Sequence, residues 1–521
     1  MSTSRTTFKH AAIYSMASML AKAVGFIMLP FYAHILKGEG YGVIGMLDAS
    51  TGFLVMLLGY GLNSTYTRFY HEEPEANRGR VVSSGVTLLW TVSLPIVGIL
   101  LLAARPATQL LLGDPSHALV FKLALLTFAL DITGQACSTI LMIQRRSVIY
   151  SATSLLRLVL GLSLNIWLIV VRGMGVTGYF LSALIVAAVS TIIYHVLAYR
   201  TCGWGFDREL MIRMLKFQLP MVPGNLVSFF SRQVERVLLR VLINLESVGV
   251  LEMGGKFPSL IPLLVTQPFM RSWNTERVRI AEQPEAPALI GRMFTKFLLL
   301  AVFAGLMMAV NIRAVLEVLT PEEFWPAWRI ARIEIVGLLL SGCYYHMMFG
   351  LYYHKKTGKI STLRAGTSLG KIGLSWLFIT TWGLAGAAWS STLTWAVLVV
   401  WTGILSQRLY PIRLEWGRIS LIVGWALILD QICLRAGLDS TAFAGWIRVA
   451  ALPWLATMIA NGPLGELKEG KLPTMFIERA IPLSSMIINT MVASLNLLLF
   501  PLFHDGARRK IQLLLRRSRT N

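Results

Sequence analysis

Long apolar stretches follow one another along this sequence and constrain its fold more than any other feature. Two lie near the start, at 11–36 and 43–66, with the short polar segment 37–42 between them. Each is long enough to cross the roughly 30 Å hydrocarbon core of a bilayer as a helix. Backbone groups find no water in that core, so a helix is the form that satisfies their hydrogen bonds. The sequence therefore predicts an all-α polytopic membrane protein.

The composition fits this class, since 55% of the 521 residues are hydrophobic and only 14% are charged. Twelve spans are predicted at 11–36, 43–66, 81–104, 118–143, 149–171, 175–198, 215–243, 248–270, 293–319, 330–353, 361–381 and 384–407. Further apolar runs follow at 419–437, 441–461 and 481–503. We expect one of these three, with 481–503 favoured, to be interfacial or re-entrant, which gives about 14 transmembrane helices in total.

Lys and Arg residues collect in alternate loops. The segments on the same side as the N-terminus carry 21 of them, and the segments on the opposite side carry five. Because basic loops stay in the cytoplasm, we predict a cytoplasmic N-terminus. The formal net charge of +22 then reflects topology and contact with anionic lipid headgroups, the basic tail 506–521 included, and not nucleic-acid binding.

A faint internal repeat links the two halves of the chain. The segment 36–44 reads LKGEGYGVI and the segment 243–251 reads INLESVGVL, so that Glu, Gly and Val recur at matching places. Transporters built from parallel repeats show weak internal sequence similarity of this kind. We predict two six-helix lobes related by a parallel repeat, with additional helices after them. The expected divisions are 1–200, 201–410, 411–505 and the cytoplasmic tail 506–521.

Several classes of function lack their signatures in this sequence. The four cysteines, Cys137, Cys202, Cys343 and Cys433, are widely separated and show no metal-ligand spacing. No protease, hydrolase or nucleotide-binding motif is found, and the loops up to residue 461 are short. We therefore expect neither an enzyme nor a metal site or cofactor, with energy supplied by an ion gradient, the membrane potential or substrate flux.

Ionisable side chains inside predicted spans are the strongest functional signal, because charges are costly in lipid. The densest group is Arg232, Glu235 and Arg236, with Arg240 farther on, and their spacing places all four on one helix face. One interpretation is a structural ion pair of Glu235 with Arg232 or Arg240, with the other cations reaching toward the headgroups. The other is a cationic stripe on a cavity wall, suited to a diphosphate because guanidinium groups bind oxyanions bidentately.

Single charges occupy other spans. Lys22 and Lys256 are the cations that we expect to join the arginines at a substrate-binding cavity. The acids Asp48, Asp131 and Glu334 are expected either to pair with cations or to couple transport to a proton or Na⁺. The residue types alone do not separate these two roles.

Three segments resemble one known family. They are LPFYAHILKGEGYGVIGMLD at 29–48, LPMVPGNL and SRQVERVLL within 219–239, and SVGVLEMGGKF at 247–257. They are similar to the first, seventh and eighth helices of Wzx-like polysaccharide flippases in the multidrug/oligosaccharidyl-lipid/polysaccharide (MOP) exporter superfamily. Glu235-Arg236 stands where relatives often have an Asp-Arg pair. The resemblance implies two lobes around a central cavity and alternating access.

The same resemblance implies a substrate and a location. The substrate would be an undecaprenyl-diphosphate-linked oligosaccharide, moved across a bacterial inner membrane for cell-surface polysaccharide or O-antigen synthesis. A polysaccharide polymerase or glycosyltransferase machinery would be the partner. The main alternative is a cation-coupled small-molecule exporter of the same fold. It is disfavoured by the dense cluster in the span 215–243, where Arg232, Arg236 and Arg240 accompany the single acid Glu235. A membrane glycosyltransferase would need a large loop, and a scaffold would need no buried cations.

Overall fold

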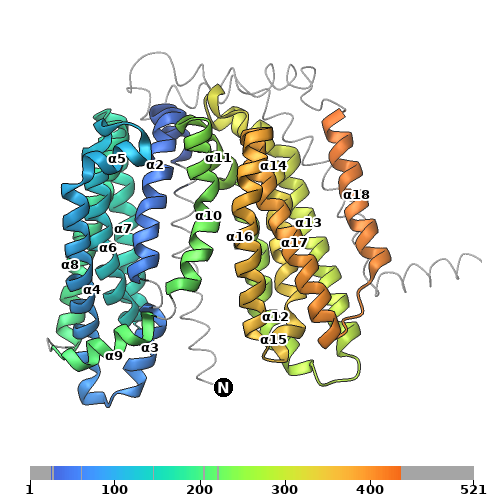
Figure 1. The fold of residues 1–521 in the computed structure, drawn as a ribbon, viewed down its shortest axis with the longest axis horizontal. Helices are drawn as coiled ribbons and strands as arrows, with labels where there is room; N and C mark the ends of the chain where they lie inside the picture. Colours follow the sequence, from blue (N-terminus) through green and yellow to red (C-terminus); the bar gives the residue numbers. More distant parts are fainter. Residues whose placement is uncertain are drawn as a thin grey trace, which may run out of the picture. The chain divides into compact units, whose positions relative to one another are not determined.

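The computed structural model describes residue 25 and residues 28–59, 62–144, 146–202, 206–219 and 222–435. All regular structure in these residues is helical, and eight of the helices are long and apolar enough to span a bilayer. The prediction of an all-α polytopic membrane protein is confirmed (Figure 1). The total of 14 spans stays a prediction, because the runs 441–461 and 481–503 lie outside the described residues.

The chain divides into two compact units, 1–249 and 250–521. The helices of the first unit are α2 (Leu29–Gly59), α3 (Leu62–Glu72), α4 (Arg78–Leu102), α5 (Ala104–Leu112), α6 (Ala118–Ile143), α7 (Ser147–Asn165), α8 (Gly175–Cys202), α9 (Arg208–Gln218) and α10 (Val222–Leu242). A π-helical segment, Ile166–Val171, continues α7. The first unit ends inside α11 (Leu245–Lys256), at Gly249.

The second unit holds the rest of α11 and seven further described helices. These are α12 (Gln267–Ile280), α13 (Ala286–Leu319), α14 (Ala327–Met347), α15 (Phe349–Tyr353), α16 (Thr357–Trp382), α17 (Leu384–Leu409) and α18 (Trp416–Arg435). An ion pair between Arg332 of α14 and Asp430 of α18 ties the last of these helices to the unit. The lobe boundary after residue 200 that the sequence suggests stays a prediction.

Predicted spans and observed helices agree where the apolar run is uninterrupted, and α6 has the predicted bounds 118–143. The span 248–270 is different, because α11 ends at Lys256 and a π-helical segment, Pro262–Thr266, precedes α12. Proline has no N–H to donate and clashes with the preceding turn, so Pro258 and Pro262 interrupt the regular helix.

The predicted loop 271–292 is also largely helical, since α12 runs to Ile280 and α13 begins at Ala286. Arg277, which the sequence places among loop cations, is only 3% exposed. Its Nη1 donates to the carbonyl of Tyr345, 2.9 Å away, and its guanidinium lies over the ring of Phe349. Arg277 therefore caps the end of α14 as a structural cation.

The polar turn predicted at 37–42 is tighter than expected. Only Lys37 leaves the helical conformation, with φ 57° and ψ −174°, while the glycines that follow it are helical. This region of backbone space is nearly restricted to glycine, so Lys37 carries backbone strain. Because the helix resumes at Gly38, the glycines of this segment can serve as a packing surface.

One contact occurs in both units and supports the predicted repeat. In the first unit Thr191 Oγ1 of α8 donates to the carbonyl of Leu130 of α6, at 2.8 Å. In the second unit Thr392 Oγ1 of α17 donates to the carbonyl of Ile333 of α14, at 3.0 Å. Each threonine packs on a glycine of the facing helix, Gly134 or Gly337 respectively. The same glycine-and-threonine crossing thus joins corresponding helices of the two units.

We expect Thr191→Val and Thr392→Val to destabilise the protein by similar amounts, about 0.5–1 kcal/mol each, because each removes one interhelical hydrogen bond. Thermal unfolding of the purified protein measures the effect. Thr127→Val is the matched control, because the Thr127 hydroxyl donates to the carbonyl of Leu123 within its own helix. An effect at one crossing and none at the other would contradict their equivalence.

A second close crossing involves the two segments of the sequence repeat. A Cβ built on Gly42 would lie 2.1 Å from the carbonyl oxygen of Leu245. A Cβ built on Gly249 would likewise lie 2.1 Å from the carbonyl oxygen of Gly38. The offset that aligns the two segments also maps one contact onto the other, so the crossing has local two-fold character. Small residues allow such close backbone approach in membrane helices.

Candidate functional site

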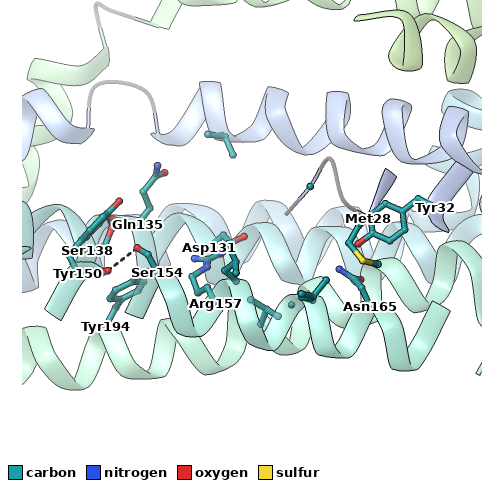
Figure 2. Close-up of a pocket in the computed structure, with 16 residues that line it drawn as sticks. Met28, Tyr32, Asp131, Gln135, Ser138, Tyr150, Ser154, Arg157, Asn165 and Tyr194 are labelled. Carbon is teal, nitrogen blue, oxygen red and sulfur yellow. Dashed lines mark hydrogen bonds and ion pairs between the residues drawn. The ribbon is translucent and has the colours of Figure 1, made fainter. Parts of the chain in front are cut away.

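A cavity of about 770 Å³ lies within the first unit, between helices α2, α6, α7 and α8. Its described wall contains Gly25, Met28, Tyr32, Val55, Asp131, Gln135, Ser138, Tyr150, Ser154, Arg157, Leu158, Gly161, Leu162, Asn165, Val186 and Tyr194. The volume is in the range of small-molecule binding sites. Polar groups are spread along the cavity, as Figure 2 shows.

Helical periodicity places the polar groups of α7 on one face. Tyr150, Ser154, Arg157, Gly161 and Asn165 recur every three or four residues and all line the cavity. The intervening positions carry large apolar groups such as Leu156 and Val159, which are exposed and suited to lipid. On α6 the spacing of Asp131, Gln135 and Ser138 produces a second polar face. The two faces meet at the cavity.

An ion pair occupies the middle of this wall. Arg157 Nη2 donates to Asp131 Oδ1 across 2.8 Å, from α7 to α6. The two side chains are 36% and 39% exposed, so both keep hydrogen-bonding atoms that face the cavity. Mutual pairing lowers the cost of holding two charges within helices that span a membrane. The pair is therefore both a link between helices and a polar contact surface.

Neutral groups lie on both sides of the pair. Figure 2 shows Gln135, Ser138, Tyr150, Ser154 and Tyr194 toward one end of the cavity, and Met28, Tyr32 and Asn165 toward the other. Asn165 Oδ1 is buried and accepts no hydrogen bond within the described residues. Tyr32 also makes an edge-on contact with Tyr179, with ring centroids 6.0 Å apart. The wall therefore offers aromatic faces, amides and hydroxyls along its length.

The predicted cationic group lies on α10, and its described members Glu235 and Arg236 are not among the described residues that line this cavity. Glu235 is buried, with 6% exposure, and Arg236 is half-buried and donates from Nη1 to Gln233 Oε1. Arg232 belongs to α10, but its side chain lies outside the described residues. Arg240, farther along the helix, packs against Gly113 at the end of α5. The common helix face of these residues follows from their spacing, and their role stays a proposal.

The other predicted site residues are dispersed. Lys22 lies outside the described residues. Lys256 is exposed at the last position of α11, and Asp48 is exposed on α2. Glu334 is half-buried on α14 in the second unit. Among the predicted residues that the structure describes, only Asp131 lines the cavity.

Arg157 was one of the candidate charges inside predicted spans but had no assigned role, and the tyrosines and amides of the cavity were not predicted, although the sequence holds a signal for them. Asp131 and Arg157 are opposite charges inside consecutive predicted spans, an arrangement that favours a pair. The recurrence of Tyr150, Ser154 and Arg157 at helical spacing marks a polar face within an apolar run. We predicted the substrate site on α10 because charged residues are densest there. The helical spacing of polar residues indicates the cavity instead.

Comparison with known proteins places the chain among polysaccharide biosynthesis proteins. A family model described as "Polysaccharide biosynthesis protein" matches residues 8–273, about half of the chain. The succinoglycan biosynthesis transport protein ExoT of Rhizobium meliloti (strain 1021) is 24% identical over 237 residues, which are 45% of this chain. The match spans 46% of that relative's length, so its whole activity does not transfer directly.

Two solved structures share the fold. The lipid II flippase MurJ in an inward closed conformation has a TM-score of 0.65 and 13% identity, covering 94% of this chain and 100% of that one. An inward-facing multidrug resistance MATE family transporter of the MOP superfamily has a TM-score of 0.59 and 15% identity, covering 76% and 95%. At such identities the likeness concerns the fold alone, and that fold is one of membrane transporters.

Proposed function

Because the chain belongs to the polysaccharide biosynthesis protein family, we propose that it flips an undecaprenyl-diphosphate-linked oligosaccharide across the bacterial inner membrane, for cell-surface polysaccharide synthesis. One structural observation carries the proposal: a cavity of about 770 Å³ with an ion pair and neutral polar groups lies among helices that span a membrane. A hydrated glycan crosses lipid only at high cost unless polar groups replace its lost water. The ExoT relative, whose name refers to succinoglycan transport, supports a polysaccharide substrate.

The proposed mechanism is alternating access, with the anionic and neutral parts of the substrate held by different groups. We assign the diphosphate to Lys22, Arg232, Arg236 and Lys256, with Glu235 keeping the attraction weak enough for release. Arginine suits this role because its planar fork bonds two oxyanion oxygens at once. Asp48, Asp131 and Glu334 are the acids proposed for ion coupling. Asp131 would do so by exchanging its bond to Arg157 for a proton or Na⁺.

Deletion of the gene tests the function. We expect undecaprenyl-linked oligosaccharide to accumulate on the cytoplasmic face and surface polysaccharide to disappear, because the glycan would no longer cross the membrane. Extraction of lipid-linked glycans, with glycosidase accessibility in inverted and right-side-out vesicles, measures the distribution. Normal surface polysaccharide, combined with raised sensitivity to cationic drugs, would instead identify a cation-coupled small-molecule exporter.

Orientation is tested by cysteine labelling in intact cells, on a background without the four native cysteines. The exposed Glu39, replaced by cysteine, should react with an impermeant thiol reagent, and the exposed Lys356 should be protected until the cells are opened. The physical reason is the excess of Lys and Arg in alternate loops, which holds those loops in the cytoplasm. Labelling at 356 and protection at 39 would reverse the proposed topology. The basic tail 506–521, proposed to lie on anionic cytoplasmic headgroups, lies outside the described residues.

A further inference from the structure

We propose that the cavity of the first unit binds an uncharged saccharide portion of the substrate and not its diphosphate. This inference rests on the proposed function and assigns a substrate chemistry to one site. The first argument is charge. Within the described wall only Asp131 and Arg157 are residues of the charged types, and they form an ion pair with each other at 2.8 Å. A diphosphate placed there would face the Asp131 carboxylate as closely as the Arg157 guanidinium.

The second argument is the chemistry of the remaining wall. A hexose presents hydroxyl groups that both donate and accept hydrogen bonds, and C–H faces that pack on aromatic rings. The amides of Gln135 and Asn165 and the hydroxyl of Ser154 match the first requirement. The half-buried rings of Tyr150 at one end and Tyr32 at the other match the second.

An unused acceptor adds to this chemistry. Asn165 Oδ1 is buried, lines the cavity and has no hydrogen-bond partner within the described residues. Rotation of the Asn165 amide toward the cavity would bring this oxygen to a ligand, and a hydroxyl donor there would satisfy an acceptor that is otherwise unpaired. An anionic phosphate has no proton to offer it at neutral pH, whereas a sugar hydroxyl has one. Asn165 therefore favours a saccharide over the diphosphate.

The cavity is elongated, because its lining residues on α7 run from Tyr150 to Asn165, a rise of roughly 22 Å at 1.5 Å per residue, which leaves room for more than one sugar ring. Its neutral groups extend along α6 and α7 on both sides of the ion pair (Figure 2). The 36% and 39% exposure of the paired side chains leaves a charge-assisted donor and acceptor for hydroxyls in the middle. An organic cation would also contact the tyrosine rings, but Arg157 repels it at the one position where an acid is present.

The test uses the full-length protein in lipid nanodiscs and saturation-transfer NMR with two neutral disaccharides, maltose and lactose, as probes. We expect transfer from the wild-type protein to at least one probe, and roughly fivefold weaker binding in Tyr150→Ala and Asn165→Leu, because each loses one or two contacts. Gln135→Leu, which keeps the ion pair, reports on the same wall if another variant fails to fold. Tyr199→Ala is the matched control, since Tyr199 is 56% exposed on α8 and outside the cavity; it should bind as the wild type does.

Competition separates the three ligand chemistries. Inorganic diphosphate and tetraphenylphosphonium, each at the concentration of the disaccharide, should leave the transfer unchanged. Displacement by diphosphate would make this an anion site and overturn the inference, and displacement by the phosphonium would make it a cation site. Absence of transfer from the wild type, or equal transfer from all variants, would also overturn it. The flippase proposal does not depend on these results, because it is tested by the accumulation of lipid-linked glycan after gene deletion. Failure of the saccharide site is therefore distinguishable from failure of the flippase function.

Discussion

Replacing Gly249 with leucine is expected to abolish the folded protein. A Cβ at this position would lie 2.1 Å from the carbonyl oxygen of Gly38 and 3.1 Å from the amide nitrogen of Gly42. Both obstructing atoms belong to a helix backbone, which cannot move aside as a flexible side chain does. Overpacking typically costs 1–3 kcal/mol, and we expect about 3 kcal/mol or more here because two helices must separate.

The measurement is the yield of monodisperse protein by size-exclusion chromatography, followed by thermal unfolding of whatever is recovered. Gly42→Leu should behave in the same way, because its Cβ would meet the Leu245 carbonyl oxygen at the same distance. Gly255→Leu is the matched control on the same helix, α11, since no heavy atom of the described residues lies within 4 Å of a Cβ built there. That variant should fold normally, because leucine also favours helix over glycine. A stable Gly249→Leu protein would show that the crossing is looser than the structure has it.

Replacing Arg236 with alanine is expected to stop export while the protein still reaches the membrane. The diphosphate is strongly hydrated, and a fixed cation is needed to replace that hydration within the bilayer. A charge-assisted hydrogen bond contributes about 1.5–3 kcal/mol, so its loss should lower export at least roughly tenfold. Arg236→Lys should restore only part of the activity, because lysine keeps the positive charge but cannot form the bidentate hydrogen bond of a guanidinium. Lys22→Ala, on the same reasoning, is expected to stop export as well.

Surface polysaccharide and lipid-linked glycan in a complemented deletion strain measure the effect, with membrane levels of each variant checked by immunoblot. Gln233→Ala should cause a partial loss, since Gln233 accepts a hydrogen bond from Arg236 and orients it. Arg313→Ala is the control, because Arg313 forms an ion pair with Glu317 one turn along α13 at the surface. Full export by Arg236→Ala at normal membrane level would mean that this cation is structural.

The spans were predictable because they depend on local properties of the chain. A run of about twenty apolar residues fixes a helix in lipid whatever its neighbours are, and so 118–143 became α6 with the expected bounds. The orientation of polar groups on a helix is equally local. Tyr150, Ser154 and Arg157 share a face of α7 because of their spacing alone. The family was also predictable from the sequence, since the segments that resemble it lie within the residues 8–273 that the family model matches.

Tertiary structure decided which of these faces meet. Asp131 and Arg157 belong to different helices. Their ion pair forms because the packing of α6 against α7 brings these two positions together. The density of charge on α10 gave no indication that Glu235 is buried or that Arg240 packs on the end of α5. Gly42 and Gly249 show a repeat in the sequence, but only the fold brings each against the other's segment. A span is a property of one helix in its solvent, whereas a site is formed by side chains that packing brings together.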